Sequence, residues 1–266
     1  GSLRAADFGG SLRSGTIALR AAMDAVKSGL KDVLVSAADS RVAEPGSDQE
    51  PQLGDAAAAL LIGEGDVAVE IEDALTTCDD FLDTWRKASD VYVLASDTRF
   101  SQTQGYMRNM EEAARGLLDR TDLRPGDFAK AVFQSSDARG HLALAKKLGF
   151  EPSQVQDPLI GTVGYCGAAH ALLMLVAALE EARPGDRLLW VSYGDGCDAF
   201  VLRATEKVER LKAGRSLNAY LQDKRSLSPY QKYLRFRGLL LGEKGHDPFS
   251  SPIMYWREQK QYLRFH

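Results

Sequence analysis

The pattern of apolar and polar positions predicts two similar runs, each a helix followed by two strands. Apolar residues recur at helical spacing in one stretch of each run, and short, nearly continuous apolar stretches follow. Such stretches are typical of strands buried on both faces. We therefore predict helices at 14–27 and 167–180 and strands at 32–38, 55–63, 187–193 and 198–203.

The repetition of this order favours a duplicated α/β fold. The second strand of each run begins on Asp-Ala, at Asp55 and at Asp198, and a turn rich in Gly or Asp precedes it. Recurrence of one order of elements is the sequence trace of a duplicated unit. The alternative is a pair of unrelated helix–strand–strand units, as in any α/β protein.

The remaining pattern divides the chain into a main domain, 1–204, and a basic and aromatic linker, 205–266. Within the main domain, an insertion is expected at about 66–127. The other elements predicted for the main domain are strands at 68–71, 91–95 and 129–133, a mixed loop at 76–88, and helices at 100–118 and 137–147. Asp137 is expected to cap the second of these helices. A charged helix is predicted at 206–212, in the linker.

Composition narrows the class of protein. The chain has 266 residues, of which 44% are hydrophobic and 26% charged, so it can bury a sizeable core. Its net charge of −4 gives no reason to expect nucleic acid, and no apolar run reaches membrane-spanning length. The three cysteines, Cys78, Cys166 and Cys197, lack metal-ligand spacing. Sparse cysteines indicate the reducing cytoplasm, and no metal site is expected in these residues.

The stretch 8–21, FGGSLRSGTIALRA, is a glycine-rich loop that leads into the first predicted helix. Ser14 or Thr16 can cap that helix. Backbone N–H groups and the helix dipole stabilise an anion or a thiolate at such a place. The same stretch resembles the nucleophile loop of the thiolase superfamily, in particular its hydroxymethylglutaryl-CoA synthase branch.

The resemblance covers about residues 5–202 and is specific in three places: 11–16, 131–150, and 161–173 with 188–202. It implies a thiolase-like duplicated layered fold, of which the N-terminal part is missing here. It also implies a homodimer, for which the stretch DVLVSAADS, 32–40, and its flanking helix are the candidate interface.

Residue by residue, the resemblance places the family's catalytic Cys at Leu12 and its His at Gln134. The family's Asn falls on Val163 or Gly164, and its upstream Glu would precede residue 1. A leucine cannot be acylated, so the usual cysteine chemistry is not expected.

Three functions stay open. One is an acyl-CoA-handling enzyme that makes or breaks a carbon–carbon bond without the usual Cys. The second is a retro-aldolase that uses tyrosine, as the resemblance to steroid side-chain aldolases of this superfamily implies. The third is a non-catalytic scaffold subunit that docks a thiolase or an OB-fold partner.

The candidate catalytic residues are Tyr165, Gln134 and Cys166, with Tyr193 the next tyrosine. Gln134 can donate a hydrogen bond to a thioester oxygen. The helix N-terminus at Cys166 is expected to lower its thiol pKa, although a small buried filler is the alternative. Candidate contacts to a coenzyme A thioester, the expected substrate, are Ser11, Leu12, Arg13, Ser14, Gly15, Asp137, Arg139, Gly164, Gly194 and Gly196.

Two of these assignments have plain alternatives. The glycines can serve tight turns and helix–sheet packing, and Leu12 can line either an acyl-CoA pocket or a packed core. The tail, at 233–240 and 255–266, resembles the linker and opening helix of a zinc-ribbon/OB-fold domain. Zinc would belong only to such a domain beyond residue 266. The alternative for the tail is an amphipathic helix that packs on the core or on a partner.

Overall fold

The computed structural model describes residues 4–87, 89–214, 216–240 and 256. The chain divides into two compact units, Gly1–Lys224 and Arg225–His266. The first unit holds the three sheets of the described residues and every candidate site residue. The boundary predicted at 204/205 stays a prediction, as does the insertion at 66–127.

The main sheet has four strands in the order β3 (Val69–Cys78), β8 (Gly196–Ala204), β7 (Arg187–Tyr193) and β6 (Lys130–Phe133). β8 pairs antiparallel with both β3 and β7, whereas β6 and β7 are parallel. The sheet is therefore mixed. The nearly continuous apolar sequence of β7 agrees with its burial on both faces.

The second sheet is an antiparallel pair, β1 (Asp32–Ser40) and β2 (Asp55–Gly63). Val35 and Ala37 of β1 are buried, whereas Leu34 and its partner Leu61 are each 69% exposed. The prediction that these strands are buried on both faces is wrong, because within the described residues helices cover only one face of this pair.

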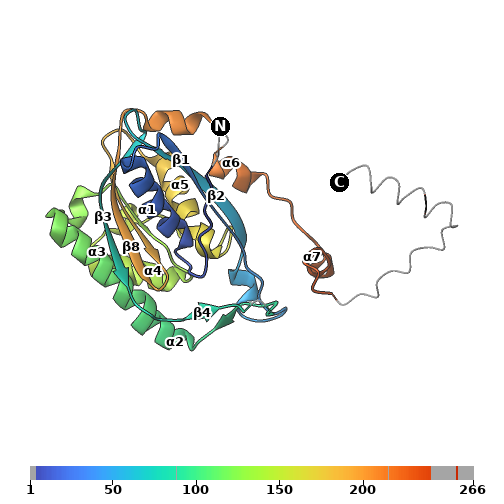
Figure 1. The fold of residues 1–266 in the computed structure, drawn as a ribbon. Helices are drawn as coiled ribbons and strands as arrows, with labels where there is room; N and C mark the ends of the chain where they lie inside the picture. Colours follow the sequence, from blue (N-terminus) through green and yellow to red (C-terminus); the bar gives the residue numbers. More distant parts are fainter. Residues whose placement is uncertain (1–3, 88, 215, 241–255, 257–266) are drawn as a thin grey trace. The chain divides into compact units, whose positions relative to one another are not determined.

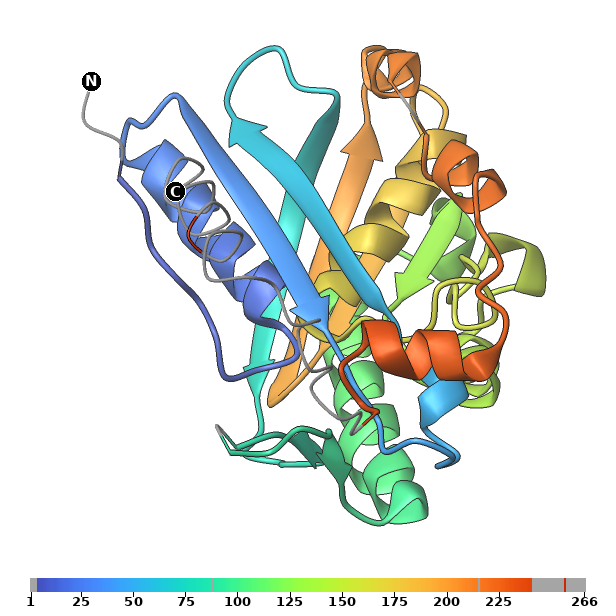
Figure 2. The ribbon, with the colours of Figure 1, turned by 90° about the vertical axis from the view of Figure 1, so that its right-hand side faces the viewer.

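The elements form four layers (Figures 1 and 2). α1 (Ser14–Lys27) and α5 (His170–Glu181) lie between the two sheets, and α3 (Arg108–Thr121) and α4 (Ala138–Leu148) cover the outer face of the main sheet. Alternate residues of β7 enter different cores: Trp190 packs with the α1 and α5 side, and Leu189 with α3 and α4. The α/β prediction is confirmed, and helix–strand–strand order occurs in α1–β1–β2 and α5–β7–β8.

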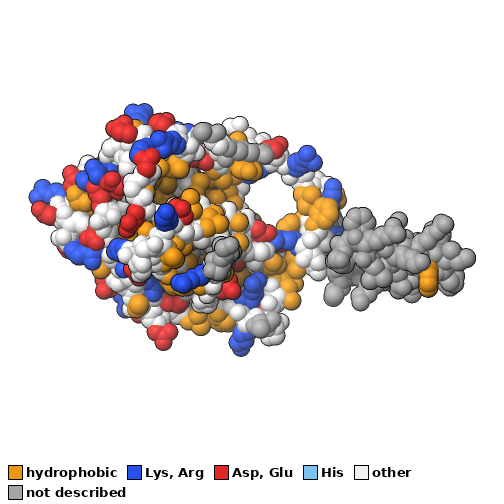
Figure 3. Space-filling model, turned by 45° about the horizontal axis from the view of Figure 1, so that its top comes forward, with side chains coloured by type: hydrophobic (Ala, Val, Ile, Leu, Met, Phe, Trp, Pro, Cys, Tyr) orange, Lys and Arg blue, Asp and Glu red, His pale blue; other side chains and the backbone are white. Residues whose placement is uncertain are grey.

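The segment 66–127 supplies β3, the short hairpin β4 (Thr84–Trp85) and β5 (Leu94–Ala95), and a continuous helical stretch. That stretch consists of α2 (Thr98–Phe100), a π-helical segment, Ser101–Met107, and α3. Acidic and basic side chains lie close together at the left of Figure 3, the side on which Figure 1 places α3. On α3, Glu111 forms ion pairs with Arg115 and with Lys147.

The shorter elements connect these layers. They are the 3-10 helices η1 (Glu50–Gln52), η3 (Pro125–Asp127), η4 (Pro152–Gln154), η5 (Gly167–Ala169) and η6 (Val208–Ala213), and the helix α6 (Leu217–Gln222). The side chain of Asp137 caps α4, as predicted. The charged helix expected at 206–212 is a 3-10 helix.

The second unit contains α7 (Tyr230–Phe236). The predicted tail helix at 255–266 lies, apart from Trp256, outside the described residues. Within the described part of the chain, no helix is both long and apolar enough to cross a membrane.

Candidate functional site

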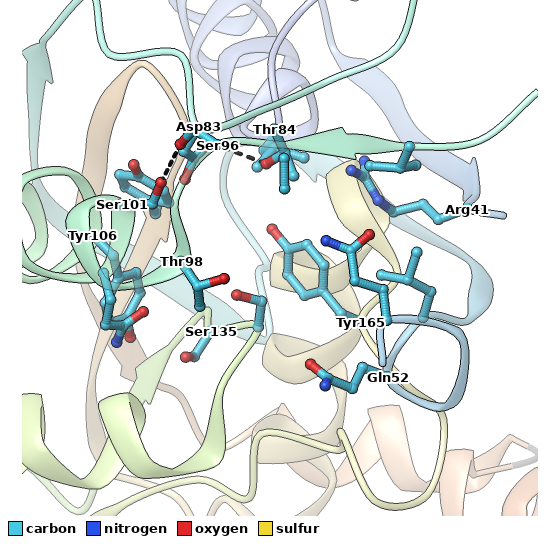
Figure 4. Close-up of a pocket in the computed structure, with 18 of the residues that line it drawn as sticks. Arg41, Gln52, Asp83, Thr84, Ser96, Thr98, Ser101, Tyr106, Ser135 and Tyr165 are labelled. Carbon is cyan, nitrogen blue, oxygen red and sulfur yellow. Dashed lines mark hydrogen bonds between the residues drawn. The ribbon is translucent and has the colours of Figure 1, made fainter. Parts of the chain in front are cut away.

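A cavity of about 370 Å³ opens at the carboxyl ends of the parallel strands β6 and β7. Ligands commonly bind beyond this edge of an α/β sheet. Figure 4 shows Tyr165 among the labelled side chains, with Arg41 and Asp83 on different sides of it. The lining residues are Leu12, Arg41, Asp48, Gln49, Gln52, Leu53, Asp83, Thr84, Val93, Ala95, Ser96, Thr98, Ser101, Gln102, Tyr106, Gln134, Ser135, Ser136, Tyr165 and Tyr193.

Gln134, which directly follows β6, is held in one orientation by four hydrogen bonds. Its amide oxygen accepts from the Ser192 hydroxyl (2.7 Å) and from the Tyr193 backbone N–H (3.1 Å). Its amide nitrogen donates to the Tyr165 hydroxyl (3.1 Å) and to the Gly167 carbonyl (3.3 Å). Because both ends of the amide are used, Gln134 positions Tyr165.

Tyr165 lies two residues before η5 and is buried, and its hydroxyl accepts a hydrogen bond from Gln134. The Arg41 guanidinium lies 5.8 Å from its ring centroid, and the His170 ring lies 5.0 Å away. Burial raises the Tyr165 pKa well above that of a free phenol; Arg41 opposes the rise and Asp83 adds to it. Tyr165 therefore keeps its proton at neutral pH, so its hydroxyl is available to donate a hydrogen bond to a ligand.

Two further tyrosines, Tyr106 and Tyr193, meet edge to face with ring centroids 5.5 Å apart. Burial raises the pKa of both, and the Asp83 carboxylate raises that of Tyr193 further. Gly105 makes room for this pair, because a Cβ there would lie 2.5 Å from both the Tyr193 hydroxyl and the Phe81 ring. The π-helical segment that carries Gly105 is of a kind frequent at functional sites.

The loop 8–21 reaches the cavity through Leu12. Arg13 is buried instead against β8, where it pairs with Asp198 at 3.3 Å and donates to the Asp195 carbonyl. Thr16 donates to Asp198 at 2.7 Å. The predicted capping of α1 by Ser14 or Thr16 is wrong, since no side chain caps this helix and the Ser14 hydroxyl donates to the Ser11 carbonyl.

No cysteine lines the cavity within the described residues. Cys166 and Cys197 are completely buried, and the Cys166 thiol donates to the Gly164 carbonyl at 3.2 Å. Burial raises the Cys166 pKa to about 12, with help from Asp55 and Asp39. The expectation of a lowered thiol pKa is wrong, because loss of solvation outweighs the helix terminus.

The other predicted contact residues lie around the cavity without lining it. The Ser11 hydroxyl donates to the Gly194 carbonyl at 3.2 Å, and Arg139 is exposed near the start of α4, which Asp137 caps. The four glycines permit close packing of backbone segments: Gly15 between α1 and α5, Gly164 against Leu53, Gly194 against Leu12, and Gly196 against Thr77.

Sequence reasoning missed the lining contributed by 83–106, which includes Asp83, Ser96, Thr98 and Tyr106. The segment 76–88 is predicted as a mixed loop, and its residues do not have the spacing of a known catalytic or ligand-binding motif. The available signal was its polar composition between two apolar runs. Among the described residues, no group of His, Cys, Asp and Glu is arranged to hold a metal.

Comparison with solved structures supports the predicted fold. The crystal structure of a hydroxymethylglutaryl-CoA synthase complexed with CoA superposes with a TM-score of 0.74 at 21% identity, over 84% of this chain and 62% of that chain. A 3-oxoacyl-[acyl-carrier-protein] synthase III from Aquifex aeolicus gives a TM-score of 0.63 at 22% identity, over 73% and 65%. The thiolase-like α/β fold is thus confirmed.

Sequence comparison is more specific. The family described as 3-oxoacyl-[acyl-carrier-protein (ACP)] synthase III C terminal matches residues 118–203. Hydroxymethylglutaryl-CoA synthase of Methanopyrus kandleri is 35% identical over 240 residues, which cover 88% of this chain and 68% of that protein. The enzyme of Aeropyrum pernix is 33% identical over 245 residues, covering 90% and 68%. The chain thus spans about two thirds of the length of these relatives, and it belongs to the hydroxymethylglutaryl-CoA synthase family.

Proposed function

We propose that this chain binds coenzyme A thioesters in the cavity and makes or breaks a carbon–carbon bond without an acyl-cysteine. The observation that carries the proposal is the lining itself: Leu12 occupies the place that the resemblance gives to the nucleophile, and no described lining residue is a cysteine. The family relatives are named for a reaction of CoA esters, which supports the substrate class.

The side chains that remain are suited to proton transfer and hydrogen bonding. Tyr165 is a protonated phenol positioned by Gln134, and it can donate a hydrogen bond to the thioester oxygen as negative charge develops there. Retro-aldol cleavage of a 3-hydroxyacyl thioester needs this donor and a base for the hydroxyl. We therefore favour retro-aldol cleavage, whose reverse forms the same bond.

The experiment has two readouts. Intact mass after incubation with acetyl-CoA is expected to show no stable acyl adduct. Incubation with short-chain 3-hydroxyacyl-CoA esters is expected to release an aldehyde or ketone and a shortened acyl-CoA.

Tyr165→Phe removes the donor and is expected to lower the rate of carbonyl release roughly 100- to 10,000-fold. Tyr92→Phe, the same change outside the cavity lining, is the control and should leave the rate unchanged. A stable acyl adduct, or a fully active Tyr165→Phe variant, would contradict the proposal. A wild-type protein that binds CoA esters without turnover would favour the scaffold.

A further inference from the structure

The base that this reaction needs is not among the tyrosines. Tyr165, Tyr193 and Tyr106 are all buried, and burial raises the pKa of each, so all three hold their protons at neutral pH. His170 and His141 are absent from the cavity lining. The described lining residues that carry a carboxylate are Asp48 and Asp83.

These two aspartates differ in their surroundings. Asp48 is exposed in the loop before η1, whereas Asp83 is half-buried and directly precedes β4. The Asp83 backbone carbonyl accepts from the Ser96 N–H at 2.9 Å, which ties it to the facing strand of the hairpin. Its Oδ1 accepts from the Thr84 hydroxyl at 3.0 Å. Asp83 is therefore the carboxylate with a fixed position in the cavity (Figure 4).

Asp83 also acts on two of the three phenols that line the cavity. Its negative charge contributes to the raised pKa of Tyr193 and of Tyr165, after the effect of burial. The Tyr193 hydroxyl lies close enough to the Asp83 carboxylate for the two to interact, and as a neutral group it leaves the charge of the carboxylate in place. The lining residue of opposite charge is Arg41, which pairs with Asp39 at 3.3 Å.

We propose that Asp83 is the catalytic base of this cavity, an inference that rests on the proposed function. Asp83 takes the proton of the 3-hydroxyl, and the oxygen electron pair becomes the second bond of the new carbonyl. The Cα–Cβ bond breaks, and its electron pair enters the thioester as an enolate that the Tyr165 hydroxyl stabilises. The proton on Asp83 then passes to Cα. The products are an aldehyde or ketone and a shortened acyl-CoA, with no oxidant or further reactant.

The test compares Asp83→Asn with Asp119→Asn, the same change at an exposed carboxylate of α3 outside the cavity lining. Asp83→Asn is expected to lower carbonyl release from short-chain 3-hydroxyacyl-CoA esters roughly 100- to 10,000-fold, with binding of the ester unchanged. Asp119→Asn is expected to change the rate less than about threefold, because this carboxylate is not among the residues that line the cavity. A second readout is the uptake of deuterium at Cα when the product acyl-CoA is incubated in heavy water, which Asp83→Asn should abolish.

Asp83→Ala separates chemistry from folding. Acetate or formate added to this variant can occupy the vacated space and restore proton transfer, an effect that a purely structural role would not produce. Wild-type activity together with an active Asp83→Asn variant, or with no rescue of Asp83→Ala, overturns the assignment of Asp83 and leaves the proposed function standing. Absence of carbonyl release and of exchange in the wild type overturns both.

Discussion

At the scale of single residues, His170 makes the fold sensitive to acid. Its ring is completely buried; Nδ1 accepts from the Cys166 backbone N–H at 3.3 Å, and Nε2 lies 2.9 Å from the Pro158 carbonyl. This arrangement requires a neutral ring that carries its proton on Nε2. Burial lowers the His170 pKa to about 4.

Because the unfolded chain binds this proton near pH 6.5 and the folded chain only near pH 4, stability is complete above pH 6.5 and falls as the pH drops toward 4. The loss attributable to His170 is about 3 kcal/mol. Urea unfolding measured between pH 7 and pH 4 tests this. His170→Gln should be less stable at pH 7 but should lose less stability on acidification, and an identical pH slope in the two proteins would contradict the assignment.

Residue roles that depend on a distant partner were not predictable from the sequence. Arg13 precedes a predicted helix within a glycine-rich loop, which favours an anion contact, yet its partner Asp198 lies 185 residues away. The two are brought together because β8 passes beside the start of α1, and Thr16 and Thr76 also donate to that carboxylate. Local pattern gives no information about such a contact.

At the scale of elements, the π-helical segment Ser101–Met107 controls the shape of the cavity. Gly105→Ala would place a methyl group 2.5 Å from the Tyr193 hydroxyl and the Phe81 ring, both rigid groups. The rings must move, so we expect the variant to stay folded and to lose most of its turnover of 3-hydroxyacyl-CoA esters. Circular dichroism and the carbonyl-release assay measure the two effects.

Gly116→Ala is the matched control, because it makes the same change within α3, outside the cavity lining. Its Cβ would approach the Leu75 side chain at 3.0 Å, which a leucine can accommodate. Replacing a helical glycine by alanine favours the helix by up to about 1 kcal/mol. Equal turnover in the Gly105→Ala and Gly116→Ala variants would refute the role given to the π-helical segment.

The pattern of apolar positions predicted most helices and strands of the two repeated runs, because most apolar residues of these runs are the ones that the fold buries. α1 and β7 have the predicted bounds, and β8 extends beyond them. The pattern failed for β1, whose apolar sequence resembles that of β7 although its Leu34 face is exposed. A run of apolar residues shows that a strand can be buried on both faces, but it does not reveal what covers each face.

At the scale of the whole molecule, the cavity assembles residues from six separate parts of the sequence. Tyr165 and Gln134 were predictable as candidates because the resemblance to a known family points to their positions. Asp83 was not, because the hairpin that carries it reaches the cavity only through the tertiary fold. Polar residues in a segment without periodicity form a site only when the tertiary fold brings them to the edge of the main sheet.

The exposed face of β1 and β2 bears on assembly, and we predict that it forms the contact of a homodimer. Leu34 and Leu61 are paired across the two strands and are each 69% exposed, and small residues continue this face at Ser36 and Ala59. Burying such a face against a second copy removes apolar area from water.

Leu34→Lys should therefore convert dimer to monomer in sedimentation experiments. Leu142→Lys, at a leucine of α4 that is 55% exposed, should leave the dimer intact. A monomeric wild type, or a Leu34→Lys variant that still dimerises with wild-type affinity, would show that this face serves another contact.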